Sequence, residues 1–138
     1  MEKSLVLIKP DAMERGLASA ILARLQGEGL KLIALKMLHV DRHLAERHYA
    51  VHKGKSFFED LLAYITSKPI VAAAFEGEKA IERIRQIMGA TDPAKAAPGT
   101  IRKDYGMDLT RNSIHGSDSP ENGEKEVALF FTKKEIFS

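Results

Sequence analysis

The chain has 138 residues, of which 44% are hydrophobic, and its formal net charge is +2 at pH 7. This length suits one globular domain over residues 1–138, and the near balance of charge argues against dedicated nucleic-acid binding. Without cysteine, the chain has no disulfides, thiolate nucleophiles or cysteine-based metal sites. It has neither a stretch of membrane-spanning length nor a signal-peptide pattern, so we expect a cytoplasmic protein with no membrane partner.

The first part of the chain predicts two strands separated by a helix. Residues 5–8 form a short, wholly apolar run, which is typical of a central strand covered on both faces. Apolar residues recur at helical spacing over residues 12–26, and glycines stop that helix. A long strand is predicted over residues 30–40, and Asp41 then caps a short helix that ends near His48.

The second part of the chain alternates again between helix and strand. We predict a helix over residues 57–64, a buried apolar strand over 70–75 and an amphipathic helix over 78–88. Residues 89–111 have no periodicity and several prolines and glycines, and a loop of that length in a compact domain is usually functional. Residues 127–132 are predicted to be the last strand.

This order of elements indicates an α+β fold on the ferredoxin-like, or split βαβ, plan. We expect an antiparallel four-stranded sheet with helices on one face. The long loop is expected to carry the active site.

The most distinctive segment is residues 112–119, where His115 stands among small polar residues. Neutral imidazole is a good nucleophile at physiological pH, so a positioned histidine can accept a transferable group without a separate base. Gly116 allows a close approach of the backbone, and Asn112 and Ser117 offer hydrogen bonds that orient the ring. The segment therefore predicts a nucleophilic histidine.

The usual glycine-rich motifs for binding phosphate do not occur in the chain. Residues 54–56 have the ending of a P-loop, but Tyr49 stands where its first glycine is required. Side chains must then neutralise any phosphates, and arginine forks are the strongest candidates. Lys9 at a strand end, Arg85 near a helix end and Arg102 in the long loop are available.

These residues together resemble the nucleoside diphosphate kinase family. The resemblance covers about residues 4–137, and several motifs occur in the same order as in that family. The matching pieces are Ile8-Lys9-Pro10-Asp11, His48-Tyr49, Phe57-Phe58, Arg85, Thr91-Asp92-Pro93, Pro98-Gly99-Thr100-Ile101-Arg102, Asn112-Ser113-Ile114-His115-Gly116-Ser117-Asp118-Ser119 and Glu124-Lys125-Glu126.

The resemblance implies an activity, its substrates and an assembly. A nucleoside triphosphate, mainly ATP, would give its γ-phosphoryl group to His115, and a nucleoside diphosphate would take it in a ping-pong cycle that maintains NTP and dNTP pools. Mg²⁺ would be carried on the nucleotide phosphates, with no metal ligands from the protein. Because a small domain with an open sheet and a long loop gains by burying them, we expect a homo-oligomer, a tetramer or a hexamer.

The resemblance also implies contacts with the nucleotide. Phe57 would stack on the base, with Leu109 on its other side. Lys9 and Asn112 would hold the sugar hydroxyls, and Lys9 would also meet phosphate. The residues implied to hold phosphate oxygens are Arg85, Thr91 and Arg102.

The reacting group has its own implied neighbours. Tyr49 would lie near the transferred phosphoryl group, while Glu126 and Ser117 would support His115. The expected catalytic set is His115, Lys9, Tyr49, Asn112, Ser117 and Glu126.

Some alternatives stay open at this point. The chain could be a nucleotide-binding regulatory module, or a phosphohistidine donor to other proteins. Ser56 replaces the proline that many family members have before the two phenylalanines, from which we expect an effect on affinity at most. The pairs His39/His43 and His48/His52 have i, i+4 spacing but lack the adjacent glutamate of a zinc protease motif, so we interpret these four as ordinary residues.

Overall fold

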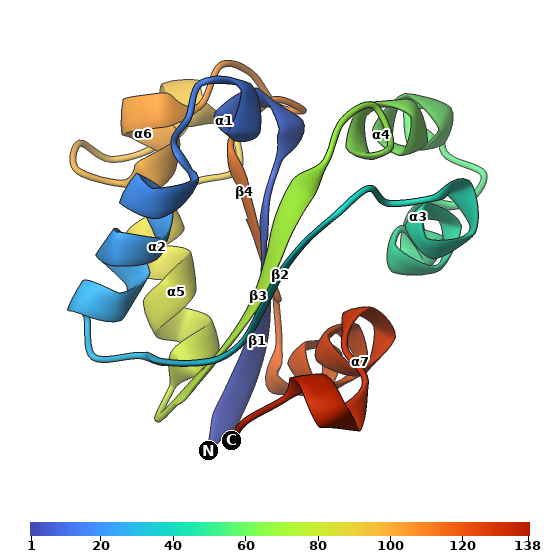
Figure 1. Cartoon of the computed structure of the whole chain (residues 1–138). Coiled ribbons are helices and arrows are strands. Elements are labelled where there is room, and N and C mark those ends of the chain that lie inside the picture. Colours follow the sequence, from blue (N-terminus) through green and yellow to red (C-terminus); the bar gives the residue numbers. More distant parts are fainter.

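The computed structural model describes all of residues 1–138 and is built on one four-stranded sheet in the order β2-β3-β1-β4 (Figure 1). Every neighbouring pair of strands is antiparallel. This order confirms the predicted split βαβ plan. The strands are β1 (Glu2–Ile8), β2 (Lys31–Leu38), β3 (Ile70–Gly77) and β4 (Ile114–Gly116).

Seven α-helices connect and flank these strands, and none of them is long and apolar enough to cross a membrane. Short 3₁₀ turns add to them at three points of the chain. The helices are α1 (Pro10–Glu14), α2 (Ala18–Gly27), α3 (Arg42–His48), α4 (Phe58–Ile65), α5 (Ala80–Met88), α6 (Ile101–Tyr105) and α7 (Pro120–Phe130).

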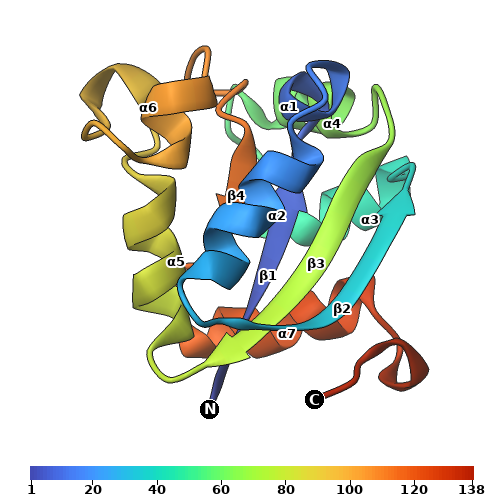
Figure 2. The same cartoon turned by 60° about the vertical axis from the view of Figure 1, so that its left-hand side comes forward.

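Helices cover both faces of the sheet, whereas the sequence predicted helices on one face. The crossovers through α2 and α5 lie on the same face, while α3, α4 and α7 lie on the other (Figures 1 and 2). The pleat of β1 explains this arrangement, because Leu5 and Leu7 belong to one core cluster and Val6 and Ile8 to the other. All four side chains are fully buried, as expected of a central strand between two layers.

The prediction of a strand over residues 127–132 is wrong. Residues 120–130 form α7, which begins with Pro120 in its first turn and Ser119 accepting a hydrogen bond from the Asn122 N–H at 3.1 Å. The helix packs across β1, and a Cβ atom at Gly123 would collide with the Lys3 carbonyl oxygen. The fourth strand is instead β4, which pairs with β1 and contains His115.

Two further helical segments differ from their predicted extent. The predicted helix over residues 12–26 is divided into α1 and α2, because Gly16 takes a left-handed φ of 68° between them. The long loop over residues 89–111 contains α6, whose first turn is capped by the Thr100 side chain. The helix cap at Asp41 is confirmed, since its carboxylate accepts from the Leu44 N–H at 2.8 Å.

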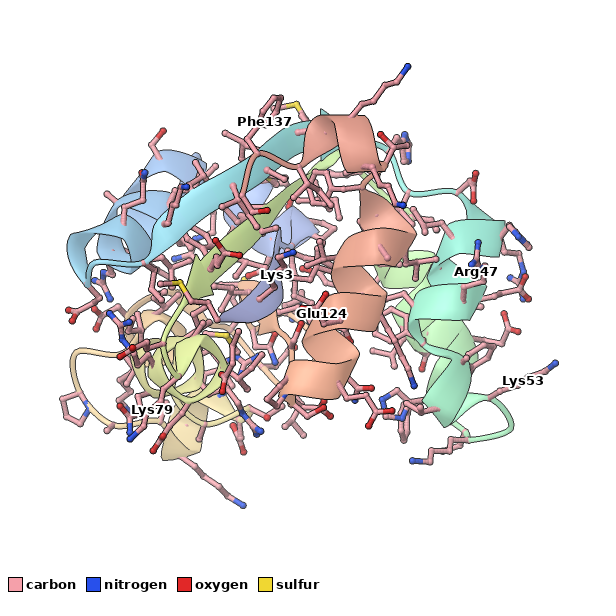
Figure 3. All side chains as sticks on the ribbon, turned by 90° about the horizontal axis from the view of Figure 1, so that it is seen from below. Lys3, Arg47, Lys53, Lys79, Glu124 and Phe137 are labelled. Atoms are coloured by element: carbon pink, nitrogen blue, oxygen red, sulfur yellow. The ribbon has the colours of Figure 1, made fainter.

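The layers meet around the central strands from which the candidate site is built. The view from below shows Lys79, at the start of α5, to the left of the sheet and Arg47, on α3, to the right (Figure 3). In the same view α7, marked by Glu124, lies between these two sides. Residues of β1 and β4 therefore lie close to helices of both layers.

Candidate active site

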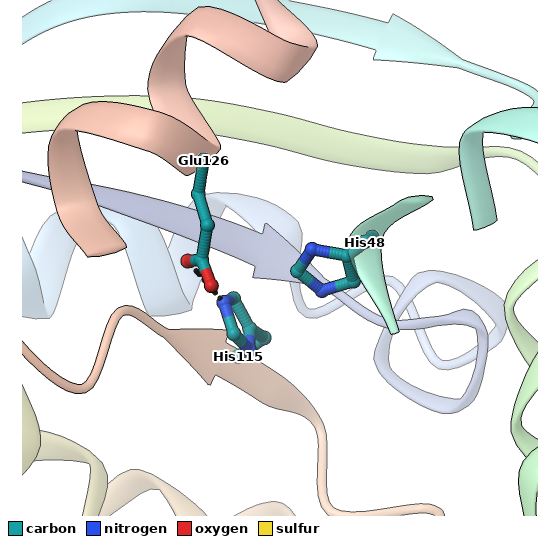
Figure 4. A group of neighbouring side chains, drawn as sticks. All are labelled: His48, His115 and Glu126. Atoms are coloured by element: carbon teal, nitrogen blue, oxygen red, sulfur yellow. Dashed lines mark hydrogen bonds and ion pairs between the residues drawn. The ribbon is translucent and has the colours of Figure 1, made fainter. Parts of the chain in front are cut away.

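His115 lies on β4, opposite Leu7 of β1, and is oriented by α7. Its Nε2 atom is 2.9 Å from Oε1 of Glu126 (Figure 4). The Ser117 hydroxyl donates to the same oxygen at 2.7 Å. Ser117 is itself fixed, because its hydroxyl accepts from the Leu5 N–H at 2.9 Å and it is fully buried. The structure therefore brings His115 together with Glu126 and Ser117, the two residues that the family resemblance placed beside it.

Glu126 determines which nitrogen of His115 is free. Burial acts to raise the pKa of Glu126, but the hydrogen bond from His115, the charge of that ring and the Ser117 hydroxyl outweigh it and lower the pKa. An ionised carboxylate only accepts hydrogen bonds, so the ring proton belongs on Nε2. The lone pair of the neutral ring is then on Nδ1, which leaves that nitrogen free to act as a nucleophile.

Lys9 and Asn112 meet although they are 103 positions apart, with Lys9 Nζ donating to Asn112 Oδ1 at 2.9 Å. Lys9 also donates to the Thr110 carbonyl at 3.0 Å. The amide group of Asn112 donates at 3.1 Å to the carbonyl oxygens of Thr91 and Leu109. Burial and the charge of Arg102 lower the pKa of Lys9 to about 8. The predicted pair for sugar and phosphate is therefore one buried, hydrogen-bonded unit.

A tight turn precedes the histidine. Ser113 has a φ of 75°, and the Ile114 N–H donates to the Asn112 carbonyl at 2.9 Å, which is the hydrogen bond of a γ-turn. This conformation is unfavourable for a side chain with a Cβ. The fully buried Ser113 hydroxyl donates to Asp11 at 3.1 Å, and Asp11 also accepts from the Tyr64 hydroxyl. These contacts hold the turn that separates Asn112 from His115.

Two arginines lie on the side of α5 and α6. Arg102 is buried and donates to the Ile114 carbonyl at 2.8 Å and to the Gly89 carbonyl at 3.1 Å, while its Nε atom is buried with no partner. Burial and the charge of Arg85 lower its pKa to about 10, so it stays charged at neutral pH. Arg85 is exposed and donates to the Asp118 carbonyl at 3.3 Å. Both cations therefore flank the β4 segment that carries His115.

His48 and Tyr49, at the end of α3, complete the surroundings of the nucleophile. The His48 ring meets His115 edge to face, with centroids 4.7 Å apart and planes at 81°. Its centroid is also 4.7 Å from that of Tyr49. Burial raises the pKa of Tyr49 to about 12 and lowers that of His48 to about 3. The sequence analysis interpreted His48 as an ordinary residue, although it stands in the His48-Tyr49 piece of the family resemblance.

The residues predicted to bind the base are on the surface. Phe57 is 44% exposed and Leu109 63% exposed, which leaves both able to contact a ligand. Phe57 lies beside the His52 ring at a centroid distance of 5.3 Å, and Leu109 lines a pocket of about 550 Å³ with Tyr64 and other residues. Thr91, predicted to hold phosphate, is also exposed.

The arrangement has the parts that transfer of a phosphoryl group requires. A neutral imidazole with a free Nδ1 can attack phosphorus, and the carboxylate on Nε2 can stabilise the positive charge that then develops on the ring. Lys9, Arg85 and Arg102 supply positive charge around it. This combination is that of a phosphotransferase, with His115 as the candidate nucleophile.

Comparison with known proteins agrees with this class. The family model described as nucleoside diphosphate kinase matches residues 2–136. The nucleoside diphosphate kinase of Herpetosiphon aurantiacus is 56% identical over 136 residues, which is 99% of this chain and 91% of that protein. That of Roseiflexus sp. is 53% identical with the same coverage of both chains. A structure of the Halobacterium salinarum enzyme in complex with CDP is 47% identical, with a TM-score of 0.96 over 99% of this chain and 91% of that one.

The chain belongs to the nucleoside diphosphate kinase family and is a phosphotransfer enzyme. Its resemblance to that family and its predicted kinase activity are therefore confirmed. The alternative of a regulatory module without catalysis does not hold.

Proposed function

We propose that the chain, as a single domain over residues 1–138, moves the γ-phosphoryl group of a nucleoside triphosphate to His115 and from there to a nucleoside diphosphate. The bond between Glu126 and His115 Nε2 carries this proposal, because it leaves Nδ1 as the nucleophile. ATP is the main donor, and the reaction maintains NTP and dNTP pools in the cytoplasm.

In the first half of the cycle, Nδ1 attacks the γ-phosphorus, a P–N bond forms, and the P–O bond to the β-phosphate breaks. The ring keeps its proton on Nε2 and gains positive charge, which the Glu126 carboxylate offsets at 2.9 Å. In the second half, a β-phosphate oxygen of another diphosphate attacks the phosphorus and the P–N bond breaks. No separate base is needed in either direction, because the diphosphate arrives as an anion.

The side chains around His115 neutralise and position the phosphates. Lys9, Arg85 and Arg102 carry the positive charges, and the unpartnered Arg102 Nε is a donor left for a phosphate oxygen. The Tyr49 hydroxyl stays protonated at neutral pH, because burial raises its pKa to about 12, and it can donate to the transferred group. Phosphoryl transfer needs little beyond such positioning and charge stabilisation. Thr91 adds a hydroxyl for the same phosphates.

Mg²⁺ fits this site as an ion bound to the substrate. The carboxylates at the site, Asp11 and Glu126, are engaged by hydroxyl and imidazole hydrogen bonds, and the nearby side chains are cationic. Oxygen atoms of the nucleotide phosphates are the ligands that remain, and Mg²⁺ commonly binds there with several waters. When bound, it would offset negative charge on the transferring group.

The remaining predicted residues bind the nucleoside. Lys9 and Asn112, joined at 2.9 Å, hold the sugar hydroxyls, and Lys9 also reaches phosphate. Phe57 and Leu109 cover the two faces of the base. The Halobacterium salinarum relative was solved with CDP, which supports binding of a nucleoside diphosphate here.

A coupled exchange of two nucleotides tests the proposal. Purified protein, Mg²⁺, ATP and GDP should yield GTP and ADP, and His115→Ala should abolish the exchange while leaving the far-UV circular dichroism unchanged. GTP formation that survives in His115→Ala would overturn the assignment of the nucleophile.

A further inference from the structure

His48 has an unused coordinating capacity. Both nitrogens of its ring are buried and neither has a hydrogen-bond partner. Burying a polar atom without a partner costs free energy, so such atoms call for an explanation. The phosphoryl transfer described above gives these nitrogens no role.

The ring lies beside two other potential metal ligands. One ligand atom each from His48, His115 and Glu126 lie within 4.8 Å of one another. The three side chains come from α3, β4 and α7 and converge on one point (Figure 4). We propose that His48, His115 and Glu126 form an inhibitory binding site for Zn²⁺ in the unphosphorylated enzyme.

The donor set favours Zn²⁺ over the Mg²⁺ of the substrate. Two imidazoles and one carboxylate are ligands that Zn²⁺ takes in sites with three protein ligands and one open position. Mg²⁺ prefers oxygen ligands in octahedral geometry and keeps its waters. Here the fourth position would hold water, and the partly exposed side chains of His115 (23%) and Glu126 (19%) leave a route for the ion.

Small movements make the geometry tetrahedral. Zinc bond lengths of about 2.0–2.2 Å in tetrahedral geometry require ligand atoms roughly 3.3–3.6 Å apart. His115 Nε2 and Glu126 Oε1, now 2.9 Å apart, would separate by a few tenths of an ångström to admit the ion at the position of the shared proton. His48 would approach through rotation of its side chain, since no hydrogen bond holds its ring.

Zinc at this site blocks the nucleophile whichever nitrogen of His115 binds it. A neutral imidazole has one lone pair in its plane and one N–H. If the ion binds Nδ1, it occupies the reacting lone pair. If it binds Nε2, the proton moves to Nδ1 and removes the lone pair there. This inhibition rests on the proposed phosphorylation of His115, whereas the binding of zinc does not.

Binding is tested on nucleotide-free protein, so that no phosphate competes for the ion. Titration with Co²⁺ should give the strong visible absorption of a tetrahedral site, and Zn²⁺ should displace it at one ion per subunit. His48→Asn and Glu126→Gln should each weaken binding by on the order of 10–100-fold or more. His43→Asn and His52→Asn, on nearby histidines outside the cluster, should leave it unchanged.

The cobalt spectrum of the wild type shows whether the bound ion is tetrahedral, and this result stands even where a variant fails to fold. An octahedral, weakly absorbing spectrum would overturn the proposal, as would binding that is lost in His43→Asn or His52→Asn but kept in His48→Asn.

Inhibition is measured separately, as phosphorylation by MgATP with and without Zn²⁺. Zinc should lower the phosphorylation rate of the wild type at concentrations that do not change the rate of His48→Asn. This comparison also corrects for zinc bound to ATP, because both proteins meet the same mixture. Equal slowing of both proteins would show that the bound ion does not control His115. A chain that binds zinc but shows no phosphorylation at all would instead refute the proposed function.

Discussion

Glu126 of α7 accepts a hydrogen bond from His115 of β4 at 2.9 Å, and this bond leaves the free lone pair of the neutral ring on Nδ1, the nitrogen proposed to react. In the proposed mechanism the carboxylate also faces the positive charge that forms on the ring when phosphorus is bound. Two roles, tautomer selection and charge stabilisation, therefore depend on one side chain.

Glu126→Gln should impair both roles. The amide can turn its NH₂ group towards Nε2 and so favour the wrong tautomer, and it has no charge. We expect the rate of phosphorylation of His115 by ATP to fall on the order of 10²–10³-fold, as when a well-placed electrostatic contact is removed. Rapid-quench measurement of the first turnover gives this rate. Glu124→Gln, at an exposed carboxylate of the same helix, is the matched control, and similar rates in both variants would refute the role of Glu126.

Lys9 should make nucleotide affinity depend on pH. Burial and Arg102 lower its pKa to about 8, whereas bound phosphates favour the charged form and raise it. Well below pH 8 the lysine is already protonated in the free enzyme, so nucleotide affinity does not change with pH. As the pH rises through 8, the free lysine loses its proton and must take one up on binding, so the affinity falls. Calorimetry of ADP binding in two buffers should detect that uptake near pH 8.5.

Lys9→Met should bind ADP more weakly at pH 7 and lose the proton uptake. Lys125→Met, at an exposed lysine paired with Glu121, should keep both properties of the wild type. Proton uptake that persists in Lys9→Met would assign it to another group.

The enzyme should discriminate little among bases. The proposed base contacts, Phe57 and Leu109, are apolar, and stacking on an aromatic face tolerates every base. Rejection by large factors would require polar groups aimed at the base edge. We expect kcat/KM for ADP, GDP, CDP and UDP to span about one to two orders of magnitude. Phe57→Ala should lower kcat/KM for all four diphosphates, most for the purines, whereas Arg102→Ala should lower kcat/KM for all four alike. Strict use of one base would contradict this account.

The exposed edge of the sheet should assemble with other copies. β2 is an edge strand, and Leu35 and Met37 on it are 51% and 66% exposed. Apolar side chains on an unpaired edge favour association. Light scattering should show a tetramer or hexamer, which Met37→Lys should weaken. Met107→Lys, at an exposed methionine away from the sheet, should not weaken assembly. A wild-type monomer at micromolar concentrations would refute the prediction.

The sequence predicted three of the four strands but missed β4 and the second layer of helices. Residues 5–8 showed the two-sided burial of β1, from which a second layer of helices could have been inferred. The prediction of a strand at residues 127–132 was wrong because the periodicity of a dense apolar run does not distinguish a strand from a helix. The N-terminal cap at Ser119-Pro120 indicated a helix. β4, with three residues, is too short to produce any periodicity.

The candidate site was predicted better than the elements that carry it. The segment around His115 predicted the nucleophile, the family resemblance implied Glu126 and Ser117 beside it, and the structure brings the three side chains together. His48 was missed, since its importance comes only from the fold, which turns its ring onto His115 rather than towards a partner on its own helix. A lone histidine at helical spacing carries no signal of such a contact.

The most direct test of the central claim is transfer of radiolabelled γ-phosphate from ATP to the protein in the absence of any acceptor. Phosphohistidine is labile in acid and stable in base, unlike phosphoserine. The account predicts a label on His115 that is lost in acid, kept in base, removed by added nucleoside diphosphate and absent from His115→Ala. A label that is stable in acid, or one that persists in His115→Ala, would contradict it.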